Sequence, residues 1–99
     1  KRLARFSEND PEPVMLYAYA AMRAGMEELA LEGFRELTAR LPSFAEGWNN
    51  LGVLLVRRGE YEAAARAFNQ ALEQMPGLEE ARKNFDIIRN HRGRAGVPQ

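Results

Sequence analysis

The amino-acid sequence predicts an all-α protein in which antiparallel helix hairpins stack into a superhelix. The first observation is composition: Ala, Glu, Arg, Leu and Lys, which all favour helices, make up more than half of the 99 residues. β-Branched residues number only seven, too few for a β-sheet of any size. The second observation is a repeat of 34 residues, and the third is the glycine or proline found at each expected turn.

The repeat appears when residues 11–44 are placed over residues 45–78. Seven positions are identical, where this composition would give about two or three by chance. A partial third copy starts at Glu79 and stops half-way. The connections between the expected helices are short, which predicts antiparallel neighbours. The identical pairs are Glu12/Glu46, Arg23/Arg57, Gly25/Gly59, Glu28/Glu62, Ala30/Ala64, Phe34/Phe68 and Pro42/Pro76.

The first repeat, residues 11–44, is expected to form helices at 12–24 and 27–41. Asp10 can cap the first of these helices, and Gly25 can adopt the left-handed conformation that ends it. Pro42 then stops the second helix. The second helix is predicted to bury one stripe of side chains, made of Leu29, Ala30, Phe34, Leu37 and Leu41.

The second repeat, residues 45–78, is expected to form a helix that ends near Arg58 and a helix at 61–75. A capping-box pattern that begins at Ser43 predicts the start of the first helix, and Gly59 predicts its end. Pro76 stops the second helix. The predicted buried stripe of that helix consists of Ala64, Phe68, Ala71 and Leu72.

Small residues at matching positions predict close contact between the helices of a pair. Gly52 lies in the middle of a helix, where it costs about 1 kcal/mol relative to alanine, so close packing is its expected role. Ala18 stands at the same position of the first repeat. Nearby aromatic side chains are expected to fill the remaining volume. These are Trp48, Tyr61 and Phe68.

The two ends of the chain differ from the repeats. Residues 79–92 are expected to be a capping segment whose helix covers 79–91. The charged Asp86 stands where the repeat has Gly52, so no further helix is expected to pack there. Residues 93–99 are expected to be a flexible tail. At the other end, residues 1–10 are expected to be the remnant of a preceding helix or a leader. Residues 1–92 are therefore predicted to form a single domain.

The second repeat resembles the tetratricopeptide repeat. The residues that carry the resemblance are Trp48, Leu51, Gly52, Leu55, Gly59, Tyr61, Ala64, Phe68, Ala71 and Pro76. The first repeat departs further from the pattern, with Val14 in place of the tryptophan and Glu27 in place of the tyrosine. The resemblance implies a right-handed stack of helix hairpins whose concave side binds a peptide segment of a partner protein.

Composition and motifs argue against catalysis or a bound cofactor. The net charge is zero, cysteine is absent and His91 is the one histidine. We therefore expect no catalytic residues, no cofactor and no metal site. His91 is interpreted as a solvated side chain near a helix end. No apolar run reaches the length of a membrane span, and we expect a cytoplasmic location.

The resemblance and the 3.6-residue period together predict a groove along the first helix of each pair. The predicted groove residues are Met15, Tyr19, Met22, Arg23, Asn49, Asn50, Val53, Arg57, Lys83, Asn84 and Ile87. Asn50 and Asn84 are expected to lie on open helix faces and to hydrogen-bond a peptide backbone. One subgroup of the family clamps a C-terminal carboxylate. That clamp is not expected here, because Glu80 and Asn84 replace two of its basic residues.

Three functions follow from these features. The leading prediction is a non-enzymatic protein–protein interaction module that binds an extended or helical segment. The first alternative is a structural segment that self-associates into a homo-oligomer. The second is a weak contact with nucleic acid or an anionic surface through the basic ends at 1–5 and 89–94, although six charges divided between two ends make nucleic acid an unlikely partner.

Overall fold

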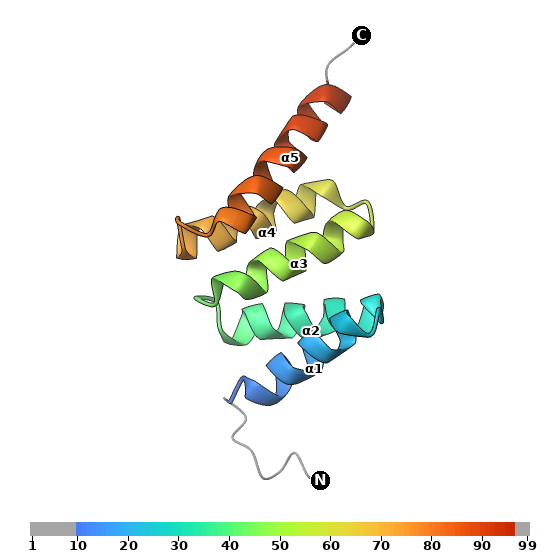
Figure 1. Cartoon of the computed structure of the whole chain (residues 1–99), viewed down its shortest axis with the longest axis vertical. Coiled ribbons are helices and arrows are strands. Elements are labelled where there is room, and N and C mark those ends of the chain that lie inside the picture. Colours follow the sequence, from blue (N-terminus) through green and yellow to red (C-terminus); the bar gives the residue numbers. More distant parts are fainter. Residues whose placement is uncertain (1–9, 97–99) are drawn as a thin grey trace. The chain divides into compact units, whose positions relative to one another are not determined.

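The computed structural model describes residues 10–96, and it describes side chains as far as His91. This part of the chain forms helices α1 (Glu12–Arg23), α2 (Glu27–Arg40), α3 (Ala45–Arg57), α4 (Tyr61–Gln74) and α5 (Glu79–Gly96) (Figure 1). They belong to two compact units, Lys1–Pro42 and Ser43–Gln99, which we call the first and the second unit. The unit boundary, after Pro42, lies two residues before the end of the first repeat. The all-α prediction is confirmed.

Two glycines end the first helix of each hairpin in the same way. Gly25 has φ 79° and Gly59 has φ 81°, which places both in the left-handed region that glycine adopts without strain. The N–H of Met26 donates to the carbonyl of Ala21, and the N–H of Glu60 donates to that of Leu55, each over 2.9 Å. These bonds satisfy carbonyls that the helix leaves open, as in a Schellman motif.

Two prolines end the second helix of each hairpin. Leu41 has φ −134° and Met75 has φ −144°, both outside the helical region. Each precedes a proline, whose ring disfavours helical geometry at the residue before it. The predicted ends at Gly25, Pro42, Gly59 and Pro76 are therefore confirmed within two residues.

The helix starts match the predictions less well. At α1, Asp10 Oδ1 accepts the N–H of Glu12 over 3.0 Å, so the expected capping interaction is present. At α3, the predicted capping box is wrong: the helix begins at Ala45 after Phe44, and no side chain caps it. Ser43 lies in the preceding turn, one residue too early for the capping role.

In the first unit, α1 packs against α2. Ala18, Ala30, Phe34 and Leu37 are fully buried there. Gly33 permits the closest approach, because a Cβ atom at that position would lie 2.8 Å from the Cβ of Ala18. The predicted stripe needs one correction: Leu29 is exposed and Leu31 is buried. The core face of α2 is therefore rotated toward Leu31, Gly33 and Thr38.

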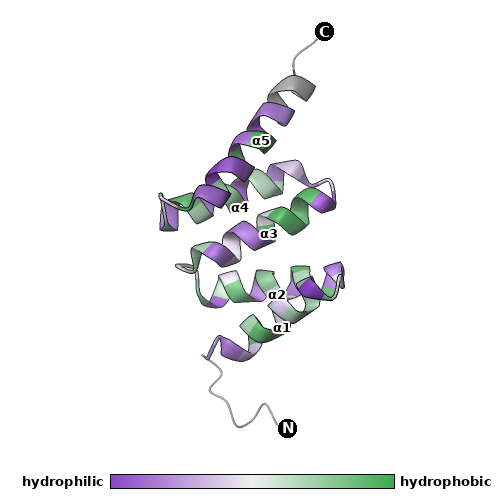
Figure 2. Cartoon of the chain, in the orientation of Figure 1, coloured by the Kyte–Doolittle hydropathy of each residue, from purple (hydrophilic) through white to green (hydrophobic). Residues whose placement is uncertain are grey.

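In the second unit, α3 packs against α4 and α5 covers α4. Ala71, Leu72 and Ala81 form a buried cluster with Trp48, Leu78 and Phe85 around it. Hydrophobic and hydrophilic residues alternate around each helix (Figure 2). This pattern is that of helices which bury one face each. None of the helices in the described part of the chain has the length and apolar character needed to cross a membrane.

Helix α5 is longer than the sequence predicted. It continues to Gly96, whereas the prediction ended it at residue 91 and assigned 93–99 to a flexible tail. Arg92, Arg94 and Ala95 favour continued helix in this segment, and no proline intervenes before Pro98. Residues 97–99, and residues 1–9 with their predicted remnant helix, lie outside the described residues.

Candidate functional site

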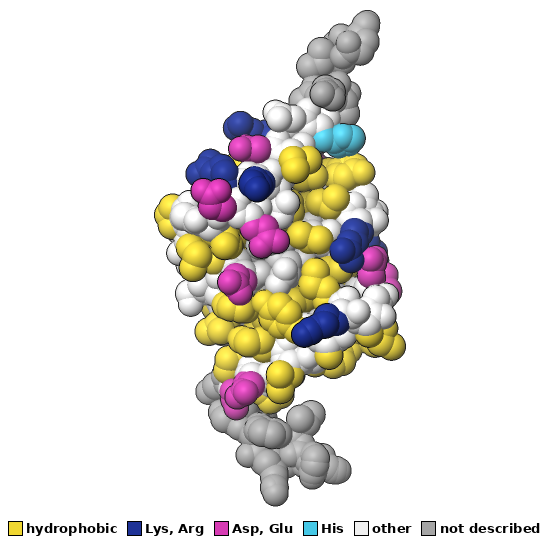
Figure 3. All heavy atoms as spheres, in the orientation of Figure 1, with side chains coloured by type: hydrophobic (Ala, Val, Ile, Leu, Met, Phe, Trp, Pro, Cys, Tyr) yellow, Lys and Arg dark blue, Asp and Glu magenta, His cyan; other side chains and the backbone are white. Residues whose placement is uncertain are grey.

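A shallow groove of about 200 Å³ lies on the second unit, between α3 and α5. It brings together four of the predicted groove residues: Val53, Arg57, Asn84 and Ile87. Ile87 is 63% exposed, although its side chain is entirely hydrocarbon. In Figure 3, hydrophobic side chains gather beside the histidine on this unit. The groove is therefore an apolar surface open to solvent, with one cation and one amide at its edge.

The floor of the groove contains residues that the sequence placed only in the core or not at all. Phe68 is 1% exposed and Ile88 is 4% exposed, and both line the groove from below. Val56 completes the wall on α3. Neighbouring helical residues point about 100° apart, so Ile88 faces the core while Ile87 faces solvent. The sequence predicts Ile87 in the groove and assigns no role to Ile88.

Asn49 is a buried link between α3 and α5, rather than an open groove residue. Its side chain is 3% exposed, and its Oδ1 accepts a hydrogen bond from Asn84 Nδ2 over 3.1 Å. Asn84 is half-buried. Asn49 was predicted as a groove residue but is buried, and Asn84 was predicted on an open helix face but is half-buried. An apolar helix interface leaves a buried amide few partners, and these two amides satisfy one another.

We expect the Asn84→Ala substitution to lower the free energy of unfolding by about 1–2 kcal/mol, because it leaves the buried amide of Asn49 without this partner. Urea denaturation of the single variants and of the Asn49→Ala/Asn84→Ala pair measures the coupling. The double substitution is expected to lower the free energy of unfolding by less than the sum of the two single substitutions. Strictly additive losses would show that the bond at 3.1 Å contributes nothing.

The other predicted residues of the second unit flank the groove without lining it. Asn50 is half-buried on α3, and Lys83 is exposed on α5. Neither contributes to the wall or the floor of the 200 Å³ groove. Their role as ligand contacts stays a prediction.

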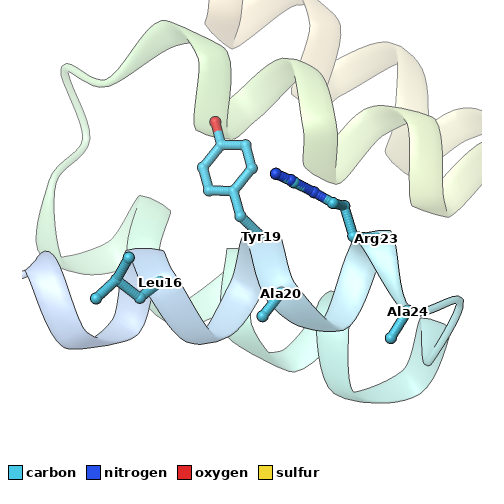
Figure 4. A pocket seen from close by; sticks show the side chains of 5 residues that line it. All are labelled: Leu16, Tyr19, Ala20, Arg23 and Ala24. Atoms are coloured by element: carbon cyan, nitrogen blue, oxygen red, sulfur yellow. The ribbon is translucent and has the colours of Figure 1, made fainter.

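In the first unit, the predicted residues on α1 lie partly in the core. Met15 and Met22 are half-buried. The ring of Tyr19 stands edge-on to Phe34, with 5.1 Å between the ring centroids and 82° between the planes. Tyr19 and Arg23 also border a recess with Leu16, Ala20 and Ala24, and the two side chains lie on the same side of α1 (Figure 4).

His91 is exposed, as the sequence suggested, but it does not lie at a helix end. Its ring lies against that of Tyr61 on α4, with the centroids 4.7 Å apart and the planes at 56°. Because α5 continues to Gly96, His91 lies within the helix. This contact joins the start of α4 to the later turns of α5. The 34-residue pattern marks Tyr61 as a packing residue but gives no sign of its partner.

The predicted basic ends are only partly described. Residues 1–5 lie outside the described residues. In the other end, Arg89 lies 5.6 Å above the centroid of the Phe85 ring, and its Nη2 is 3.9 Å from Asp86 Oδ1. Its charge is therefore partly offset by a neighbour on the same helix. Among the described residues, no cluster of three or more His, Cys, Asp or Glu side chains could hold a metal ion.

The pairs of antiparallel helices and their 34-residue spacing place the chain among the α-helical repeat proteins. Residues 45–78 match the family model of the tetratricopeptide repeat. The chain thus carries a tetratricopeptide repeat at the position of the second predicted repeat, and the resemblance seen in the sequence is confirmed. Repeats of this family generally act as protein–protein interaction modules and are typically non-catalytic.

Two solved structures show the same fold. The TPR2B domain of yeast Sti1, solved in a complex with pHsp70, is 20% identical, with a TM-score of 0.76; the match covers 86% of this chain and 67% of that chain. MamA is 17% identical, with a TM-score of 0.80, over 88% of this chain and 51% of that chain. This chain therefore spans about half the length of MamA. At such identities the likeness is one of fold.

Proposed function

We propose that the chain is a non-catalytic protein–protein interaction module whose groove between α3 and α5 binds a peptide segment of a partner protein. The observation that carries the proposal is the exposed Ile87 in an apolar groove bordered by Arg57 and Asn84. A groove of about 200 Å³ is smaller than a typical small-molecule pocket of roughly 300–1,000 Å³. Its size suits one or two aliphatic side chains of a peptide.

The chemistry of the groove defines the peptide. An aliphatic side chain on Val53, Val56 and Ile87 would remove apolar surface from water at about 25 cal/mol per Å². Arg57, in the last turn of α3, offers a cation to an acidic side chain or a C-terminal carboxylate. Asn84 keeps an amide oxygen for a backbone N–H of the peptide, because its Nδ2 is bound to Asn49. The expected ligand therefore has an aliphatic residue near an acidic group.

The complex of Sti1 TPR2B with pHsp70 supports a peptide ligand by analogy of fold. Two positions argue against the same clamp in this chain: Glu80 brings a negative charge where the clamp has a lysine, and Asn84 replaces an arginine. A peptide from pHsp70 is a useful comparison ligand, because the fold is shared while these two positions differ. We expect it to bind more weakly than a peptide chosen on this groove.

A displayed random-peptide library, selected on the purified chain, would provide the ligand. We expect Ile87→Glu to weaken the selected peptide at least about tenfold, since it places a carboxylate on the apolar groove beside an acidic ligand. Calorimetry would measure the affinity, and circular dichroism would check the helical content. Arg57→Glu should weaken acidic peptides more than neutral ones.

The matched control is Met75→Glu, which also places a charge at an exposed hydrophobic residue of the second unit but outside the groove. It should bind the peptide like the wild type. Equal affinity for Ile87→Glu and Met75→Glu would contradict the proposal and move the binding surface away from the groove.

A further inference from the structure

The face of α1 that α2 does not cover is apolar. Leu16, Ala20 and Ala24 follow one another at intervals of four residues, so they lie along one side of the helix. Leu16 is 65% exposed. The three residues border one recess together with Tyr19 and Arg23 (Figure 4). Contacts with α2 are made by the opposite side, where Ala18 and Ala21 are buried. An exposed leucine beside two small residues is suited to the close approach of another helix.

Opposite charges mark the two ends of this face. Glu12 lies in the first turn of α1 and Arg23 in the last turn, and both are exposed. They are about three helical turns apart, so they point to the same side, within roughly 40° of Leu16. A second copy of α1 running in the opposite direction brings Arg23 of the partner subunit to Glu12, and its Glu12 to Arg23. A copy running in the same direction brings like charges together.

We propose that this face of α1 binds a second copy of the chain, with the two α1 helices antiparallel about a twofold axis. Leu16 of each copy packs near the middle of the contact, over the partner's Tyr19 and Ala20. Two symmetry-related Glu12–Arg23 pairs form at its ends. Such a surface is self-complementary, as an isologous dimer requires. The inference is independent of the proposed peptide groove, which lies on the second unit.

Sedimentation velocity of the full chain over a wide concentration range tests the proposal. We expect a reversible change from 11.2 kDa to about 22 kDa. Leu16→Glu should abolish the dimer, because it buries two uncompensated carboxylates. Circular dichroism of the variant checks that the helices are intact. A wild-type chain that stays monomeric throughout, or a dimer that Leu16→Glu leaves unchanged, overturns the proposal.

Charge reversal tests the antiparallel orientation. Glu12→Arg and Arg23→Glu should each raise the dimer dissociation constant about tenfold, because two attractive pairs become repulsive. The double variant should restore the wild-type value, since each pair is attractive again. Glu32→Arg, an exposed reversal on α2, is the control and should change nothing.

Two further outcomes contradict the proposal, one its orientation and the other its occupant. If the double variant does not recover, the antiparallel pairing is wrong. If the full chain is monomeric and dimerises only after residues 1–9 are removed, that segment covers α1 instead.

Discussion

Replacing Phe68 with alanine is expected to lower the free energy of unfolding by about 3–5 kcal/mol, which is enough to unfold the second unit at moderate temperature. The Phe68 ring is 1% exposed, lies against Gly52 and forms part of the groove floor. Its loss leaves a cavity between α3 and α4 that small neighbours cannot fill. Urea denaturation followed by circular dichroism measures the effect.

Phe85→Ala is the matched control for this substitution. Phe85 is only half-buried, and it packs against the rim of the cluster formed by Ala71, Leu72 and Ala81. Its removal should cost less than half as much, because less apolar surface returns to water. Equal losses for the two phenylalanines would show that Phe68 is no more important to the core than a residue at its edge.

The Gly52→Val substitution is expected to cost about 3 kcal/mol, although valine has the better helix propensity. A Cβ atom at Gly52 would lie 2.4 Å from Phe68 Cε1 and within 2.8 Å of two further ring atoms. The ring is 1% exposed and closely packed, so it can turn away from a new side chain only by displacing its neighbours. The two helices must therefore separate, and thermal unfolding should occur well below the wild-type midpoint.

Two controls test whether contact with Phe68 is the cause: the substitution Gly77→Val, and Gly52→Val made in a Phe68→Leu variant. Nothing lies within 4 Å of a Cβ atom at Gly77, so valine there should be nearly neutral. In a Phe68→Leu background, Gly52→Val should cost less than in the wild type, because the shorter side chain makes room. A Gly52→Val cost that is unchanged in that background would mean that contact with Phe68 is not the cause.

The proposed peptide groove depends on the same packing. Phe68 supports the groove from below, and the Asn49–Asn84 bond holds α5 to α3 beside it. Substitutions at Phe68 or Asn84 will therefore change both stability and peptide affinity. Ile87 is the better probe of binding because its exposed side chain contributes little to the core.

The candidate site could be predicted from the sequence only in part. The repeat period and the 3.6-residue spacing correctly place Val53, Arg57, Asn84 and Ile87 on one surface. The same spacing does not separate Asn49, which is buried, from Asn50, which is half-buried. A helical period defines a stripe about a third of the circumference wide, and the packing of the neighbouring helix decides which edge of that stripe is covered.

What the sequence by itself determined is the set of helices and where the first four of them end, but not the end of α5 at Gly96. These depend on local sterics: the left-handed glycines at 25 and 59, the prolines at 42 and 76, and the preference of alanine, glutamate and arginine for helix act within a few residues. The resemblance to the tetratricopeptide repeat follows from the same local pattern at its fixed spacing.

Only the tertiary structure decided how each helix is turned about its axis and what each side chain meets. It places Leu31 inside and Leu29 outside, buries Asn49 against Asn84, and lays His91 on Tyr61. It also shows that close approach is allowed by Gly52 in one hairpin and by Gly33 on the opposite helix of the other. Such contacts join residues far apart in the chain, and their energies depend on neighbours that no local pattern specifies.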